Sequence, residues 1–96
     1  MEDTDAIIDK LYDVKEAAFS EIHEVRTFRC YRQKKNGGTQ AVTVEIKDAG
    51  YHLGPDLRYS VLAVSDEGTR AVGNPADTIQ HALVLTHWNE LDRPTK

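Results

Sequence analysis

The sequence predicts an α+β fold with an N-terminal helix, a four-stranded antiparallel sheet and a C-terminal helix, an α-β-β-β-β-α two-layer sandwich. Three observations support it. Apolar residues recur at every third or fourth position near both ends of the chain, which is the helical period. They alternate with polar residues in the middle of the chain, which is the strand period. An Asn-Gly-Gly sequence at 36–38 marks a hairpin turn between two of these strands.

The first element is predicted to be an amphipathic helix over residues 4–22, with Asp3 or Thr4 as its N-cap. Its apolar stripe consists mainly of Ile7, Leu11, Val14, Ala18 and Ile22. Because no Pro/Gly/Ser-rich linker divides the 96 residues, we expect residues 1–96 to form a single α+β domain.

Two strands flank the Asn-Gly-Gly turn, and the length of the loop sets their register. A three-residue loop over 36–38 pairs Phe28 with Ile46 and Cys30 with Val44, which makes one face of the hairpin apolar. A two-residue loop shifts the pairing by one residue and turns every side chain to the other face. We therefore expect the three-residue loop, with Cys30 as an inert core residue rather than a nucleophile.

The rest of the chain is predicted to contain a loop, two strands and a closing helix, over 48–57, 58–64, 69–72 and 74 to about 91. Asn74 is the expected N-cap of the closing helix, and Pro75 is its expected first residue.

The closing helix carries apolar residues on two opposite sides. One side holds Ile79, Ala82 and Leu83, and the far side holds Val84, Leu85, Trp88 and Leu91. A helix that lies on a sheet needs one apolar arc only. The far side can pack on the N-terminal helix, or it can bind another chain. Exposed apolar patches and tryptophan are both typical of protein interfaces, so the four far-side residues are candidate interface residues.

The loop at 48–57 is a second candidate contact site. It places Tyr51, His52 and Leu53 between two glycines, and loops on rigid scaffolds often carry binding residues. An equally good interpretation is that Tyr51 or Leu53 anchors the end of the sheet.

One short segment of this acidic chain is basic. The net charge is −4, yet residues 25–44 carry five bases and no acid. Arg26, Arg32, Lys34 and Lys35 are therefore candidate phosphate contacts, and a nucleic-acid-binding accessory protein is the alternative function. The order of elements is similar to that of double-stranded RNA-binding domains. Those domains place lysines at the start of the last helix, where this chain has Asn-Pro-Ala-Asp-Thr, so the resemblance does not extend to their phosphate grip.

Catalytic motifs are absent from the sequence. His81 and His87 are six residues apart, whereas two metal ligands on one helical face are three or four apart. No Cys-x-x-Cys, Gly-x-Ser-x-Gly, P-loop or dinucleotide fingerprint occurs. We therefore expect no metal, no cofactor and no enzymatic activity.

The lengths of the apolar runs, the charge of the N-terminus and the number of cysteines indicate the cellular compartment. The longest apolar run, 82–85, is far shorter than the roughly 20 residues that span a bilayer. The N-terminus is acidic, unlike a secretory leader, and a single cysteine suits a reducing cytoplasm. The expected function is that of a small cytoplasmic protein-binding module, either a homodimer or a stoichiometric inhibitor or adaptor. Phage-encoded anti-defence proteins are a class of this kind.

Overall fold

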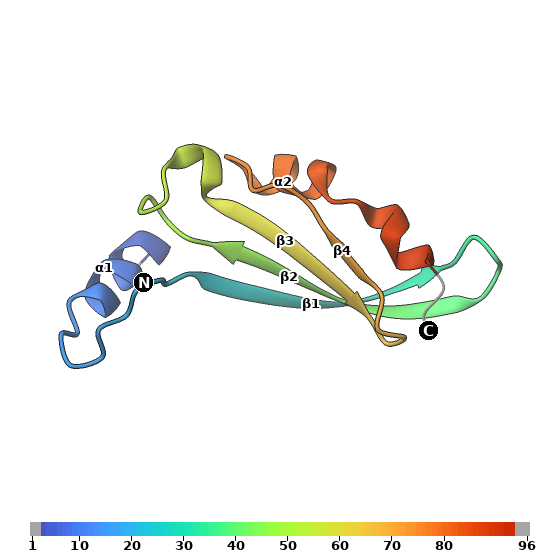
Figure 1. Cartoon of the computed structure of the whole chain (residues 1–96), viewed down its shortest axis with the longest axis horizontal. Coiled ribbons are helices and arrows are strands. Elements are labelled where there is room, and N and C mark those ends of the chain that lie inside the picture. The colour runs from blue at the N-terminus through green and yellow to red at the C-terminus, as the bar shows by residue number, and fades with distance from the viewer. Residues whose placement is uncertain (1–2, 94–96) are drawn as a thin grey trace.

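The computed structural model describes residues 3–93 and confirms the predicted order of elements. The helices and strands are α1 (Thr4–Tyr12), β1 (Glu24–Gln33), β2 (Thr39–Asp48), β3 (Tyr59–Ser65), β4 (Arg70–Val72) and α2 (Ile79–Leu85), with 3-10 helices η1 (Pro55–Leu57) and η2 (Trp88–Asp92). The strands form one antiparallel sheet in the order β1-β2-β3-β4, so each pairs with its neighbour in the chain. Figure 1 shows α2 and η2 on one face of this sheet and α1 at its end.

The core lies between the sheet and residues 79–92, which comprise α2 and η2 and are called the closing segment. Alternate residues of β2 and β3 point toward α2 and η2 and are buried there. The core consists of Val42, Val44, Val61, Ala63, Ala71, Ala76, Ala82 and Leu91. The residues between them point to the opposite face, which α2 and η2 leave open. Leu62 and Val64 of β3 are only half-buried on that face.

A buried glutamine fastens η2 to the sheet. Gln40 is 2% exposed, and its Nε2 donates to the Leu91 carbonyl oxygen at 3.0 Å and to Glu67 Oε1 at 2.9 Å. Its Oε1 accepts a hydrogen bond of 2.7 Å from Arg32 Nη1, so both ends of the amide are satisfied. Thr69 Oγ1 donates to the same Leu91 carbonyl at 3.1 Å. A buried polar group costs little free energy when every donor and acceptor is paired, and here the paired groups also fix the position of η2.

The N-terminal helix is shorter than predicted. It begins as expected, with the Asp3 carboxylate accepting from the Ala6 amide at 2.9 Å, but it ends at Tyr12 instead of residue 22. Ala18 adopts a left-handed conformation (φ 52°), and Phe19 is exposed. The helical period continues to residue 22, but helices of this length need a tertiary surface to pack on. In the described part of the chain Ile8 is buried beside Gly50, whereas Ile7, Leu11 and Val14 of the predicted apolar stripe are exposed.

The hairpin has a different register from the predicted one. Phe28 pairs with Val44 and Cys30 with Val42, because the Lys34 amide donates to the Gly38 carbonyl oxygen at 2.6 Å. The loop is still three residues long but covers 35–37, and Gly37 takes its positive φ of 93°. A shift of two positions keeps each side chain on its predicted face. Cys30 is nevertheless exposed, so the prediction that it lies in the core is wrong.

The predicted closing helix is two short helices. Residues at its expected start are extended, because Ala76 exchanges backbone hydrogen bonds of 2.8 and 3.0 Å with Tyr59. The N-cap is therefore Thr78, whose side chain accepts from the His81 amide, and not Asn74. The helix ends at Leu85, since Thr86 is extended (ψ 134°) and η2 follows in a new direction. The prediction of two apolar sides assumed one continuous helix, so it does not hold beyond Leu85.

Candidate protein-binding surface

The predicted interface residues of the closing segment separate into buried and exposed ones. Leu91 is 2% exposed and belongs to the core, so its prediction as an interface residue is wrong. Leu85 is half-buried against the core. Trp88 is 36% exposed, and its indole N–H donates to the Leu83 carbonyl oxygen at 2.8 Å. Only Val84, at 69% exposed, projects freely into solvent. The closing segment therefore offers a partner Val84 and part of one indole ring.

The 49–54 loop joins α1 to the sheet. His52 Nε2 lies 3.0 Å from Asp9 Oδ1, and its ring packs on Tyr12 with centroids 4.5 Å apart. Tyr51 lies over the guanidinium of Arg58, with 4.9 Å between the Arg58 Cζ and the ring centroid. Tyr51 and Leu53 remain exposed. Two of the three predicted loop contacts thus already have partners within the chain.

Arg58 is the centre of this junction. Its Nε donates to Asp48 Oδ1 at 2.8 Å, and its Nη2 lies 3.5 Å from Asp5 Oδ2 of α1. Burial raises the pKa of Asp48, but the hydrogen bonds from Arg58 and the Gly50 amide outweigh it and hold that pKa below 3.8. The same ion pair raises the pKa of Arg58. The carboxylate of Asp48 therefore depends on Arg58 for its charge compensation.

We expect Arg58→Ala to lower the free energy of unfolding by about 2–3 kcal/mol at neutral pH, since it leaves a largely buried carboxylate without its charged donor. The pKa of Asp48 is depressed on folding, so the stability that it contributes is present above its ordinary pKa of 3.8 and is lost as the pH falls below it. The difference between wild type and Arg58→Ala should therefore shrink at acid pH. Urea unfolding at both pH values measures it. Arg70→Ala, which removes an exposed arginine, is the control and should change little.

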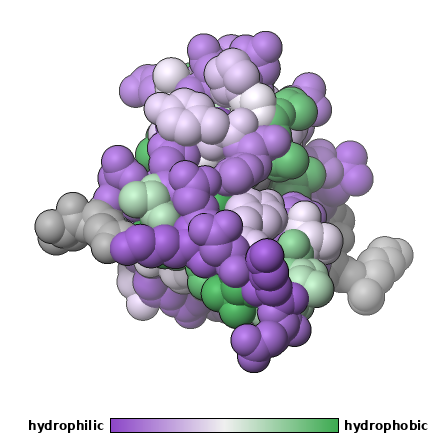
Figure 2. All heavy atoms as spheres, turned by 90° about the vertical axis from the view of Figure 1, so that its left-hand side faces the viewer, coloured by the Kyte–Doolittle hydropathy of each residue, from purple (hydrophilic) through white to green (hydrophobic). Residues whose placement is uncertain are grey.

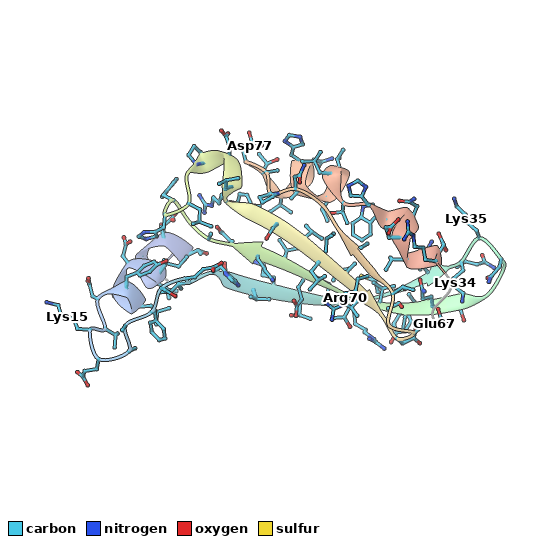
Figure 3. All side chains as sticks on the ribbon, viewed as in Figure 1. Lys15, Lys34, Lys35, Glu67, Arg70 and Asp77 are labelled. Carbon is cyan, nitrogen blue, oxygen red and sulfur yellow. The ribbon has the colours of Figure 1, made fainter. Side chains whose placement is uncertain are left out.

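The four predicted phosphate contacts have acidic neighbours. Arg32 Nη1 and Nη2 each lie 3.1 Å from the Asp92 carboxylate, and Lys34 Nζ lies 2.9 Å from Glu67 Oε2. Figure 3 shows Lys34 turned toward Glu67 and Lys35 pointing away from the sheet.

Arg26 Nη2 lies 3.8 Å from Glu24 Oε1. The hydrogen bond from Arg32 and the charge of Lys35 lower the pKa of Asp92. The hydrogen bonds from Lys34 and Gln40 lower the pKa of Glu67. These acids remain ionised near neutral pH, so they compensate much of the positive charge that a phosphate would require.

Strand β1 has side chains that no helix covers. In Figure 1, β1 lies at the edge of the sheet, whereas α2 and η2 pack on β3 and β4. Phe28 and Cys30 point to the helix-bearing face but lie beyond the helices, and Phe28 is 49% exposed. Val25 and Tyr31 are exposed on the opposite face, Tyr31 at 77%. We call these four residues, together with the free edge of the strand, the β1 surface.

The backbone of β1 is half unpaired. In an antiparallel ladder, alternate residues of a strand direct their N–H and C=O groups toward the same neighbour. Lys34 bonds to Gly38, so the even-numbered residues of β1 face β2. The odd-numbered ones, Val25, Thr27, Arg29, Tyr31 and Gln33, direct theirs outward. Within residues 3–93, no strand pairs with this edge.

The edge lacks two features that usually prevent strand addition. β1 contains no proline, and its register with β2 runs without a bulge from Glu24 to Gln33. Its protection consists of the charges of Arg26, Arg29 and Arg32. The first strand of a meander is necessarily an edge strand, so this surface could have been predicted from the order of elements. The assignment of Phe28 to the apolar face and of Cys30 to the core concealed it.

Three clefts formed by residues 3–93 have volumes between about 150 and 270 Å³. One between α1 and the segment before β1 has a volume of about 150 Å³ and is lined by Thr4, Ile7, Ile8, Leu11, Ile22, His23 and Glu24. Ligand pockets usually exceed about 300 Å³. Figure 2 views this end of the molecule, where apolar side chains form separate areas among hydrophilic ones.

Among residues 3–93, no three His, Cys, Asp or Glu side chains are grouped to hold a metal ion. None of the helices in this range is long and apolar enough to cross a membrane.

The fold and the β1 surface define a small α+β domain with an open sheet edge. Comparison of the chain with protein-family models, curated proteins and solved structures finds no match.

Proposed function

We propose that this protein is a non-enzymatic protein-binding module that acts by stoichiometric contact, and that it binds through the β1 surface. The observation that carries the proposal is the state of β1, a ten-residue strand that within residues 3–93 is paired along one edge only. Helices contact its two ends, through Thr4 and Glu24 and through Asp92 and Arg32, and leave the middle of the strand exposed. An extended edge can accept a strand from another chain, since main-chain hydrogen bonds supply affinity and alternate side chains supply specificity.

The side chains of β1 support the same proposal. Phe28 and Tyr31 are aromatic residues of the kind that interfaces favour, and Arg29 lies between them. Val84 and Trp88 are the exposed apolar residues of the closing segment and form a smaller candidate surface. Cys30 adds a condition, because an exposed thiol without a second cysteine persists best in a reducing compartment. The proposal therefore places the protein in the cytoplasm.

Co-purification from the native host tests this proposal. Tagged and untagged chains are expressed together, so that a second copy is recovered as readily as a different protein. We expect wild type and Val84→Glu to retain a protein in a fixed molar ratio and Phe28→Glu to lose it. Both substitutions place a charge at an exposed site, so they are matched for their effect on folding. Recovery of no protein, or of nucleic acid in a salt-sensitive manner, contradicts the proposal.

A further inference from the structure

We infer that the partner of the β1 surface is a second copy of this chain, with two β1 strands pairing antiparallel into one continuous sheet. This inference rests on the proposed function and names its partner. A two-fold axis perpendicular to the sheet brings the outward-facing N–H and C=O groups of the two strands together and keeps the helix-bearing faces on the same side. Such a pairing uses one surface twice, so that surface must be self-complementary.

The residue pattern of β1 is self-complementary in one register. With Phe28 on the two-fold axis, it faces the partner's Phe28 on the helix-bearing face. Glu24 then lies opposite the partner's Arg32, and Val25 opposite the partner's Tyr31. The register places an opposite-charge pair at each end, an apolar pair next to it and an aromatic pair at the centre, and each kind of cross-strand pair stabilises a sheet.

Neighbouring registers are less favourable. With Arg29 on the axis, it faces the partner's Arg29, and Arg26 faces the partner's Arg32, so like charges oppose one another at three places along the strands. With Thr27 on the axis, the overlap shortens to 24–30 and Glu24 loses its basic partner. The Phe28 register pairs residues 24–32 and opposes no like charges.

The monomer leaves room for this arrangement. α2 and η2 pack mainly on β3 and β4, and the contacts of helices with β1 are at its ends, through Asp92 to Arg32 and through Thr4 to Glu24. Arg32 bonds to Asp92 and Gln40, and Glu24 accepts a hydrogen bond of 2.6 Å from Thr4 Oγ1 within the same chain. The Arg32 side chain is still 31% exposed, so the partner's Glu24 would add to these bonds at its accessible part. The outward hydrogen bonds come from Val25, Thr27, Arg29 and Tyr31 of each strand, none of which bonds to β2 through its backbone.

Light scattering coupled to size exclusion tests the pairing. We expect the wild-type chain to elute at twice its mass of 10.8 kDa and to dissociate on dilution. Thr27→Pro removes an outward N–H without touching the β1–β2 ladder, so it should give a folded monomer. Thr27→Val keeps that N–H and should remain dimeric. Circular dichroism shows whether the proline variant is folded, and Phe28→Glu serves as a second disruptive variant if it is not.

Disulfide cross-linking tests the register. Cβ atoms of directly opposed residues lie about 4.5–5 Å apart, close to the distance that a disulfide requires. Phe28→Cys combined with Cys30→Ser should therefore give a covalent dimer under mild oxidation. Tyr31→Cys with Cys30→Ser is the control. Its thiol is more exposed, but in this register it lies several residues from its symmetry mate, so only random collision would cross-link it.

Three outcomes contradict the inference: a monomer at every concentration, equal cross-linking at both positions, or dissociation by Val84→Glu but not by Phe28→Glu. A monomer that still retains a different protein through β1 overturns the homodimer and leaves the proposed function intact. A chain that retains no protein overturns both.

Discussion

Replacing Leu91 with alanine is expected to lower the free energy of unfolding by about 2–5 kcal/mol. Leu91 is 2% exposed and packs in the core from η2, so the shorter side chain leaves a cavity that the sheet cannot fill by collapsing. Its carbonyl accepts from Gln40 and Thr69, which hold the backbone in place and limit relaxation further. Urea unfolding followed by the fluorescence of Trp88, the only tryptophan, measures the loss.

Val84→Ala is the matched control. Val84 is 69% exposed on the neighbouring helix, so the same kind of truncation should change stability by less than about 0.5 kcal/mol. If Leu91→Ala unfolds like wild type and instead weakens association, Leu91 belongs to an interface and the core described above is wrong. The two variants thus decide between the two roles that the sequence allowed for this segment.

The hairpin illustrates how far alternation can predict structure. Alternation of apolar and polar residues correctly assigned Phe28 and Cys30 to the same face as Val42 and Val44. The starting residue of the loop was wrong, because glycines at both 37 and 38 can supply a left-handed position and local sequence does not choose between them. The prediction that Cys30 is buried was wrong for a different reason. A face of a sheet is buried only where a helix lies on it, and which strands a helix covers depends on tertiary packing.

In the closing segment, the helical period of the apolar residues predicts the structure only as far as Leu85. Ile79 to Leu85 follows the helical period, but the predicted two-sided helix required that period to continue past Thr86. Its side chain bonds instead to the Ala82 carbonyl oxygen at 2.9 Å, and the backbone turns toward Val72. A threonine within an apolar run gives little warning of such a break, since the same residue is tolerated inside helices. Trp88 and Leu91 consequently lie on a separate 3-10 turn.

The β1 surface could have been predicted only in part. The order of elements makes β1 an edge strand, and Arg26, Arg29 and Arg32 are visible in the sequence. Their acidic partners are harder to predict from the sequence, because Asp92 is 60 residues from Arg32 in the chain. Long-range ion pairs of this kind depend on the docking of η2, which the sequence pattern did not predict. The basic segment therefore looked more available to phosphate than it is.

The second large effect is expected from Gly73→Ala, which should lower the free energy of unfolding by about 1–3 kcal/mol or more. A Cβ atom at this position would lie 2.9 Å from the Thr86 Cα and closer still to the Leu85 carbonyl group. These neighbours are backbone atoms in the turn between α2 and η2, so they cannot swing aside as a side chain would. Relief of the clash requires the whole closing segment to move away from β4. This movement would strain the hydrogen bond of 3.0 Å that the His87 amide donates to the Val72 carbonyl oxygen of β4.

Gly38→Ala separates this steric effect from the general effect of replacing glycine. Its new Cβ would meet Lys34 Cε at 3.3 Å, the far end of a flexible side chain, and Gly38 does not need a positive φ. The loss of backbone freedom in the unfolded chain is the same in both variants and favours folding slightly. Gly38→Ala should therefore be neutral or mildly stabilising in urea unfolding, while Gly73→Ala is destabilised and shows an altered Trp88 environment. Equal stability of the two variants means that the closing segment tolerates displacement from β4, and η2 is then held over the core by the hydrogen bonds of Gln40 and Thr69 to the Leu91 carbonyl oxygen and by the Arg32–Asp92 ion pair.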